Sequence, residues 1–424
     1  MHTIETLDNG LTVITENNPH IFSFDTQVWV RAGSRYENES NNGISHFLEH
    51  MFFKGSERFP TQRMIERLVE RTGGASNAAT SKEWVFYMVK SPSSQIELAS
   101  DILSSMLKEP LFRETDIEME KGPVVNELKG NQDNPSNYIW ILYDKLQFGN
   151  QPLGWNIGGD EKQVQSFTRS DIAKYMDSLY SPENMVLVYA GNLPKNILEI
   201  AGKYYGEFPR RSSYKFNPYK ARKQTKPKVN IKPLKSEKVQ LILGVEGYNR
   251  FSPRINSVNI LSNILGEGGS SRLFYEIRDK RGLAYGVHTS HFQYHDTGSF
   301  VAATAVQPEN LQETLEIILA EFNKTKNEQI TQEELIDAKE MIKGEKAISM
   351  ENNHYLALSM GKSFLLKGKI KPYEEFCKEI DGVNAEDVAE AANDLFKPEK
   401  YNLQLVGPIR KKQKEKLYEA LAAA

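Results

Sequence analysis

One spacing recurs along this chain and constrains its fold more than any other feature. Three pairs of residues stand 216 positions apart: Pro92 and Pro308, Pro182 and Pro398, and Gly191 and Gly407. In the last two pairs, the proline precedes a short apolar run and the glycine ends it, in MVLVYAGN and again in YNLQLVGP. A single offset that recurs over distant segments indicates an internal duplication.

The duplication predicts two tandem homologous domains, residues 1–208 and 233–424. Between them, residues 209–232 are rich in Pro, Lys and Arg, which is typical of a linker. Each copy combines alternating, strand-like runs with longer helical patterns, such as 97–107 and 309–322. We therefore expect an α+β fold, in which each domain has a largely antiparallel sheet with helices packed on one face.

The segment GISHFLEHMFFKGS, residues 43–56, carries two histidines and a glutamate within an otherwise apolar helical pattern. At about 100° per residue, His46, Glu49 and His50 form one stripe, and the apolar side chains lie on the opposite side. In the second copy the equivalent of HFLEH is NILSN, residues 259–263. The helical pattern survives there without these three side chains, so the fold does not require them.

Two imidazoles at positions i and i+4 can bind one metal ion from a single helix face. Zinc fits best, because it favours nitrogen and carboxylate ligands in tetrahedral geometry. A catalytic zinc keeps a position for water and lowers the pKa of that water to about 7. Glu49 can accept the proton, which makes H-x-x-E-H the inverted form of the zinc-protease helix. A solvent-facing polar stripe is the alternative, since short motifs give false positives.

A third ligand is then required, and a later helical segment offers Glu120 and Glu127, seven residues apart on one helix face. His50 and Glu127 are 77 residues apart. With this spacing the chain closely resembles the M16 family of zinc peptidases, also called the pitrilysin or insulinase family. The resemblance implies that His46, His50 and Glu127 bind one Zn²⁺ per subunit. It also implies that Glu49 is the general base and that Glu120 supports catalysis from nearby.

A second segment, GGASNAATSKEWVFY at residues 73–87, matches the GG-x-x-NA-x-T pattern of the same family. The resemblance implies an exposed edge strand that pairs with the substrate, with Asn77 and Ala78 as contacts. Backbone pairing with a sheet edge gives affinity with little demand on sequence, which suits extended peptides. A glycine turn that enters an ordinary strand remains the alternative.

The second copy contributes Arg278 and Tyr285, seven residues apart in GEGGSSRLFYEIRDKRGLAYGV. In the family this pair binds the substrate and helps to stabilise the tetrahedral intermediate. A guanidinium and a phenol can both donate to a developing oxyanion. The alternative is a surface arginine beside a half-buried tyrosine.

Three other histidines, His288, His291 and His295, cluster in a strand-like segment. Spacings of three and four residues place strand neighbours on different faces, which disfavours a second metal site there.

The composition narrows the expected partners and location. A net charge of −3 provides no electrostatic attraction for nucleic acid. No apolar run approaches the roughly 18 residues needed to span a bilayer, so we expect no membrane partner. Cys377 is the one cysteine, which excludes an internal disulfide and fits a reducing compartment. No secretory signal is visible in the opening MHTIETLDNG. We therefore expect a cytoplasmic protein.

The size of the chain suggests the short-chain branch of the family, which includes the mitochondrial processing peptidase. The resemblance implies two subunits that close like a clamshell around a cavity. Because both motifs lie in one chain, we expect a homodimer that cleaves unstructured peptides. A non-catalytic structural or partner subunit is the main alternative, although such members lose residues of the zinc motif. An unrelated zinc hydrolase would have no reason to carry Arg278 and Tyr285.

Overall fold

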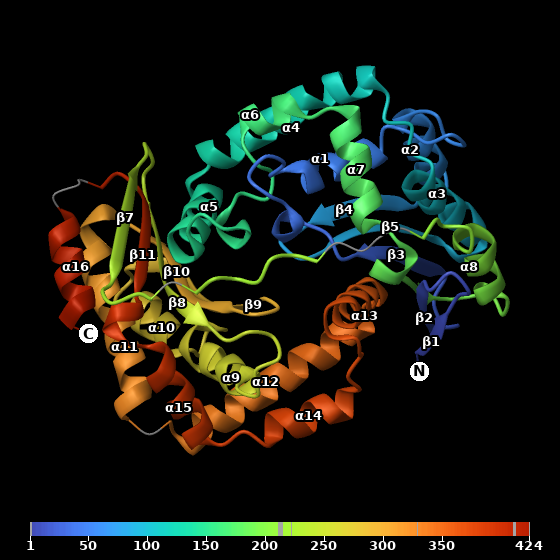
Figure 1. The fold of residues 1–424 in the computed structure, drawn as a ribbon. Coiled ribbons are helices and arrows are strands. Elements are labelled where there is room, and N and C mark those ends of the chain that lie inside the picture. Colours follow the sequence, from blue (N-terminus) through green and yellow to red (C-terminus); the bar gives the residue numbers. More distant parts are fainter. Residues whose placement is uncertain (1, 211–214, 222, 329, 410–412, 424) are drawn as a thin grey trace. The chain divides into compact units, whose positions relative to one another are not determined.

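The computed structural model describes residues 2–210, 215–221, 223–328, 330–409 and 413–423. These residues form two compact units (Figure 1). Unit 1 contains Met1–Lys129, Trp155–Asn217 and Ile348–Ile370. Unit 2 contains Gly130–Gly154, Pro218–Ala347 and Lys371–Ala424. Within the described part of the chain, every helix is too short or too polar to span a lipid bilayer.

Unit 1 is built on a six-stranded sheet in the order β1-β2-β6-β3-β5-β4. Its strands are β1 (Thr3–Thr6), β2 (Thr12–Asn17), β3 (Ser23–Val30), β4 (Ala75–Thr80), β5 (Val85–Pro92) and β6 (Met185–Gly191). All neighbouring strands are antiparallel except β2 and β6, which are parallel. The sheet is thus largely antiparallel, as the sequence predicts.

The helices of unit 1 cover both faces of this sheet. They are α1 (Ile44–Phe52), α2 (Gln62–Glu70), α3 (Ile96–Lys108), α4 (Glu114–Asp133, which continues into unit 2), α6 (Glu161–Ser166), α7 (Arg169–Leu179), α8 (Ile197–Tyr205) and α13 (Asn353–Lys367). On one face, α1 and α3 pack over alternate residues of β3 such as Val28 and Val30. On the other face, α13 packs against Trp29 and Val188 (Figure 1).

Unit 2 repeats this plan with a five-stranded sheet in the order β7-β11-β8-β10-β9. Its strands are β7 (Lys228–Pro233), β8 (Val239–Gly247), β9 (Ala284–Gln293), β10 (Gly298–Val306) and β11 (Asn402–Gly407). Its helices are α5 (Pro135–Phe148), α9 (Ile255–Gly266), α10 (Arg272–Phe274), a π-helical turn (Tyr275–Asp279), α11 (Leu311–Asn327), α12 (Gln332–Glu351, which continues into unit 1), α14 (Tyr373–Asp381), α15 (Ala385–Leu395) and α16 (Lys414–Ala423). Here α5 covers one face of the sheet and α9 and α15 lie over the other.

The strand orders of the two sheets correspond, so the predicted α+β class with two related copies is confirmed. Gly191 ends β6 at φ 131° and Gly407 ends β11 at φ 146°, a backbone conformation that favours glycine. The same offset of 216 thus marks the same structural position in both units.

The structure departs from the sequence-based expectation on one point. Helices pack on both faces of each sheet, and the second face is covered by a helix from the other half of the chain: α5 in unit 2 and α13 in unit 1. The compact units therefore differ from the contiguous division into 1–208 and 233–424, which stays a prediction about the repeat. The predicted linker, 209–232, contains residues 211–214 and 222, which lie outside the described residues, and β7 starts inside it at Lys228.

Candidate metal centre

Helix α1 is fixed at its N-terminus by a buried carboxylate. Glu37 accepts hydrogen bonds from the backbone N–H groups of Gly43 (2.8 Å) and Ser45 (2.9 Å) and from the side chain of Asn42 (2.8 Å). These bonds satisfy donors that a helix start leaves unpaired. Burial nevertheless raises the pKa of Glu37, because it disfavours the charged form.

The apolar face of α1, with Phe47, Leu48, Met51 and Phe52, is fully buried, which leaves the histidine face free for another role.

The structure brings His46, His50 and Glu127 together, within 4.8 Å of one another through their ligand atoms. The Nε2 atoms of the two histidines are 3.4 Å apart. Glu127 Oε1 lies 3.4 Å from His46 Nε2, and Glu127 Oε2 lies 3.5 Å from His50 Nε2.

These three separations test whether the residues suit a metal ion. They are longer than good hydrogen bonds. Two donor atoms bound to a tetrahedral zinc at about 2.0–2.2 Å would lie about 3.3–3.6 Å apart. The two nitrogens and the carboxylate therefore fit one zinc ion, in both chemistry and spacing.

Helix α4 supplies the carboxylates of this cluster from two of its turns. Glu120 Oε1 lies 2.9 Å from His50 Nδ1, on the side of the ring away from Glu127. Burial opposes the charged form of His50, but its interactions with Glu120 and Glu127 raise its pKa to about 9. The interactions of Glu127 with His46 and His50 hold its pKa well below the usual range of a glutamate. A metal ion that binds here must displace a proton from His50, so binding depends on pH.

Glu49 lies on the same face of α1 and makes one contact that the sequence did not predict. Its Oε2 accepts a hydrogen bond from the hydroxyl of Thr80, the last residue of β4. Thr80 is the final residue of the matched segment GG-x-x-NA-x-T, so a signal was present, although no role was assigned to it. This contact joins the expected general base to the strand that is expected to hold the substrate.

β4 forms one edge of its sheet, because it pairs with β5 alone among the described strands. Asn77 and Ala78 therefore lie on an edge, opposite Met88 and Tyr87 of β5. The backbone N–H of Ala78 donates to the side-chain oxygen of Asn77 at 2.9 Å. A strand at the edge of a sheet suits the pairing expected of these residues.

Arg278 and Tyr285 lie in unit 2 and contact each other. Arg278 belongs to the π-helical turn Tyr275–Asp279, and its guanidinium carbon lies 4.7 Å from the centre of the Tyr285 ring. Tyr285 is 80% exposed on β9, an edge strand of the second sheet. Single π-turns often occur at functional sites. The roles of both residues stay a prediction.

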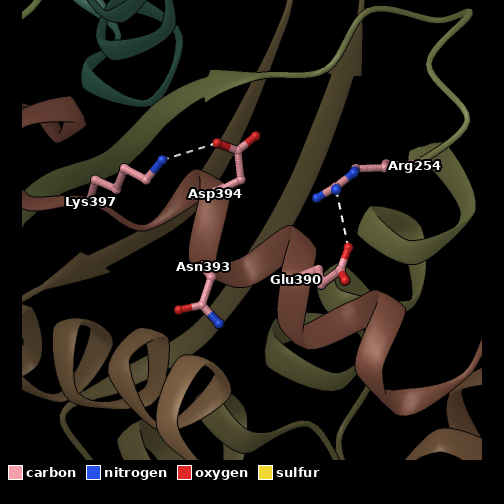
Figure 2. Close-up of a pocket in the computed structure, with 5 residues that line it drawn as sticks. All are labelled: Arg254, Glu390, Asn393, Asp394 and Lys397. Atoms are coloured by element: carbon pink, nitrogen blue, oxygen red, sulfur yellow. Dashed lines mark hydrogen bonds and ion pairs between the residues drawn. The ribbon is translucent and has the colours of Figure 1, made fainter.

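Two other features of unit 2 do not form a second centre. Among the described residues, no further group of metal-ligating side chains converges, and the cluster at His288, His291 and His295 is not one. Figure 2 shows a surface pocket lined by Arg254, Glu390, Asn393, Asp394 and Lys397. Its charges are paired, with Arg254 3.1 Å from Glu390 and Lys397 3.1 Å from Asp394. None of the predicted site residues lines it.

Comparison with known proteins agrees with this geometry. The family model described as insulinase (peptidase family M16) matches residues 12–160, and the one described as peptidase M16 inactive domain matches 166–342. The uncharacterized zinc protease YmxG of Bacillus subtilis is 35% identical over 95% of this chain and 97% of its own length. The chain belongs to the M16 peptidase family. An uncharacterized zinc protease of Rickettsia felis is 33% identical over 93% of this chain and 94% of its own length.

Solved structures show that the fold of this M16 chain is shared widely. A protease from Helicobacter pylori superimposes with a TM-score of 0.89 at 23% identity, over 96% of this chain and 99% of that one. A chain of complex III2 from Candida albicans superimposes with a TM-score of 0.84 at 17% identity, over 99% of both chains. At these identities the likeness concerns the fold alone. The family predicted from the sequence motifs is thus confirmed, and its relatives are named zinc proteases.

Proposed function

We propose that this chain is a zinc-dependent endopeptidase that cleaves unstructured peptides, with Glu49 as the general base. One observation carries the proposal: the ligand atoms of His46, His50 and Glu127 lie 3.4–3.5 Å apart in pairs. Glu49 shares a helix face with both histidines. In a family whose relatives are named zinc proteases, this arrangement supports peptide hydrolysis.

The zinc ion, when bound, supplies a Lewis acid that polarises the scissile carbonyl and lowers the pKa of a nearby water. The protein residues then manage the protons. Glu49 Oε accepts a proton from water and later returns it to the leaving amine. The Thr80 hydroxyl holds one carboxylate oxygen of Glu49, which orients the other for this transfer. Arg278 and Tyr285 donate to the developing oxyanion.

The substrate class follows from β4. An extended peptide adds to the edge of the sheet next to Asn77 and Ala78, and its backbone rather than its side chains provides most of the affinity. A folded domain has few segments free to pair in this way. We therefore propose that unstructured chains are cleaved and stable globular proteins are not.

The assembly is part of the same proposal. Two copies form a homodimer that encloses a chamber, and Arg278 and Tyr285 of one subunit complete the zinc site of the other. A two-fold dimer then holds two identical composite sites. We further propose that the protein acts in the cytoplasm, without nucleic-acid or membrane partners.

The alternative function is that of a non-catalytic structural or partner subunit. The match to a model described as an inactive domain covers residues 166–342, which begin in the first copy but contain neither the histidine motif nor Glu127. The other family model covers His46, Glu49, His50 and Glu127, all of which are present. The intact motif favours the catalytic proposal.

Mass-spectrometric mapping of cuts in a diverse peptide library tests the proposal directly. We expect zinc-dependent cuts with the wild-type protein and none with Glu49→Gln. A stable globular protein added to the same reaction should stay intact. Cuts that persist unchanged in Glu49→Gln would contradict the mechanism. Zinc-loaded wild-type protein that makes no cuts would favour the non-catalytic alternative.

A further inference from the structure

Lys54 is a cation beside the metal cluster to which the proposed reaction assigns no task. It lies in the turn that follows α1, and its side chain is 23% exposed. Its ammonium forms an ion pair with Glu120 Oε2 and donates a hydrogen bond of 3.0 Å to Gln62 Oε1. Lys54 thus touches the carboxylate that supports His50, without approaching the ligand atoms themselves.

Glu120 connects Lys54 to the metal ligands. One carboxylate oxygen faces Lys54, and the other lies 2.9 Å from His50 Nδ1. The side chain of Glu120 is only 8% exposed. Burial therefore raises its pKa, but the hydrogen bonds with His50 and Lys54 outweigh this effect and lower its pKa.

The position of the Glu120 carboxylate decides how the His50 ring is held. A metal-ligating histidine commonly has its other ring nitrogen hydrogen-bonded to a carboxylate, which fixes the orientation of the ring. Nε2 is the atom that faces His46 and Glu127. Without the contact between Glu120 Oε1 and His50 Nδ1, the ring would lose the partner that keeps Nε2 on this side.

The second copy shows that the fold does not require this arrangement. At the offset of 213 that relates the two motif helices, Glu267 corresponds to Lys54 and Asn263 to His50. α4 and α12 start 218 residues apart, and at this offset Ala338 corresponds to Glu120. The cation, the carboxylate and the imidazole are thus all replaced in the copy that lacks the histidine motif.

We propose that Lys54 is a positioning residue of the metal centre: its ion pair with Glu120 Oε2 fixes the carboxylate, so that Oε1 holds the His50 ring with Nε2 toward the other two ligands. This inference rests on the proposed function, because it takes the cluster to be a zinc site. It concerns binding of the metal and not the chemistry that follows.

Direct repulsion between the Lys54 charge and the metal ion would have the opposite effect on zinc binding, so an experiment can separate the two explanations. A positive charge close to a dication weakens binding by Coulomb repulsion. Loss of the Lys54 charge should on that ground alone strengthen zinc binding. If Lys54 acts through Glu120 and His50, its loss should weaken zinc binding.

The test is the zinc dissociation constant of the metal-free full-length chain, measured by competition with a chromogenic chelator. Lys54→Met keeps the aliphatic stem and removes the charge, and we expect binding about tenfold weaker, as for other residues that support a metal ligand. Lys54→Arg should restore it. Lys129→Met is the matched control, because it removes an equal charge from α4, where Lys129 pairs with Glu161 at 3.0 Å. It should bind zinc like the wild type.

A double-mutant cycle separates the relay from mere loss of stability. In a Glu120→Gln background, Lys54→Met should have no further effect on zinc binding. Should Lys54→Met not fold, Lys54→Gln makes the same comparison. Wild-type zinc affinity in a folded Lys54→Met protein would overturn the inference and leave the proposed function standing. A wild-type protein that binds no zinc would contradict the proposed function itself.

Discussion

Helices α1 and α9 occupy equivalent places in the two copies and differ on one face only. Both bury apolar residues, which include Phe47, Leu48 and Met51 in α1 and Ile260, Leu261 and Ile264 in α9. Where α1 carries His46, Glu49 and His50, α9 carries Asn259, Ser262 and Asn263. The apolar face is what the fold requires, and the opposite face is where the copies have diverged. The difference places the candidate metal ligands in unit 1.

Both motif helices contact an edge strand, α1 through a glutamate and α9 through a serine. Glu49 accepts from Thr80 on β4, and Ser262 Oγ lies 3.0 Å from the hydroxyl of Thr289 on β9. Thr289 also donates to the backbone carbonyl of Ser262 at 2.7 Å. In both units a threonine of the edge strand thus hydrogen-bonds the helix. In unit 1 this contact holds Glu49, the proposed general base.

The largest effect should come from removing the side chains that distinguish α1 from α9. Glu49→Gln removes the general base but no metal ligand, so zinc should remain while turnover falls by about 10²–10⁴-fold. His50→Ala and Glu127→Ala should lose both zinc and activity. The measurements are elemental analysis and peptide hydrolysis. Ser262→Ala on α9 is the matched control and should retain both. Near-normal turnover in Glu49→Gln would refute the assigned role.

The second test asks whether the two units of different subunits complete each other. Glu49→Gln and the double variant Arg278→Ala/Tyr285→Phe should each be nearly inactive as homodimers. In a mixed dimer one site collects both lesions and the other collects none. Random pairing makes half of the dimers mixed, so co-expression should restore about a quarter of wild-type activity by symmetry. Demonstrably mixed dimers without recovered activity would rule out a shared site.

The histidines of the two units contrast in their charge. Carboxylates raise the pKa of His50 in unit 1, whereas burial lowers the pKa of His291 in unit 2 to about 4. Burial disfavours the charged form of His291, and an interaction with the backbone of Tyr248 offsets this effect only in part. His291 is therefore stable in the folded protein only as the neutral form.

This contrast predicts a loss of stability in acid. The unfolded chain binds a proton on His291 near pH 6.5 and the folded chain binds it only near pH 4. Titration of His291 therefore lowers the free energy of unfolding as the pH falls below 6.5. This loss should reach about 3 kcal/mol at pH 4. Denaturant unfolding between pH 7 and pH 4 measures it. His291→Phe should flatten the dependence, whereas the exposed His20→Gln should not. An equal slope in both variants would contradict the assignment.

The sequence predicted the residues of the candidate site better than it predicted how the helices pack on the sheets, for a physical reason. Helical periodicity groups His46, Glu49 and His50 on one helix and Glu120 and Glu127 on another, and the resemblance to the M16 family joins the two sets. The contacts of Thr80 and Lys54 depend on how separate segments meet, which periodicity does not encode. An amphipathic pattern shows that a helix buries a face, but not which sheet receives it. The placement of α5 and α13 on the opposite copy's sheet was therefore not predictable.

Helices α13 and α5, each packed on the sheet of the opposite copy, make equivalent contacts. The large and the small residue of the contact change places between helix and sheet. Trp29 of β3 pairs with Val186, and Gly244 of β8 pairs with Asn402, 216 residues further on. In unit 1 the sheet supplies the aromatic ring, and Gly361 of α13 packs against it. In unit 2 the helix supplies the ring, Tyr143 of α5, and Gly244 of the sheet receives it. Each sheet thus accepts its helix through one aromatic residue that faces one glycine.

The smallest predicted effect tests this interchange. A Cβ on Gly361 would lie 2.2 Å from Trp29 Nε1, whose N–H donates to Gln27 at 2.8 Å. Gly361→Ala gains about 1 kcal/mol of helix propensity but overpacks a rigid ring, so we expect a net loss of about 1–2 kcal/mol. Gly344→Ala in α12 is the matched control, since no atom lies within 4 Å of its Cβ. It should gain about 0.5–1 kcal/mol. Denaturant unfolding of both variants at pH 7 gives the comparison, and equal stabilisation would show that α13 does not depend on the glycine.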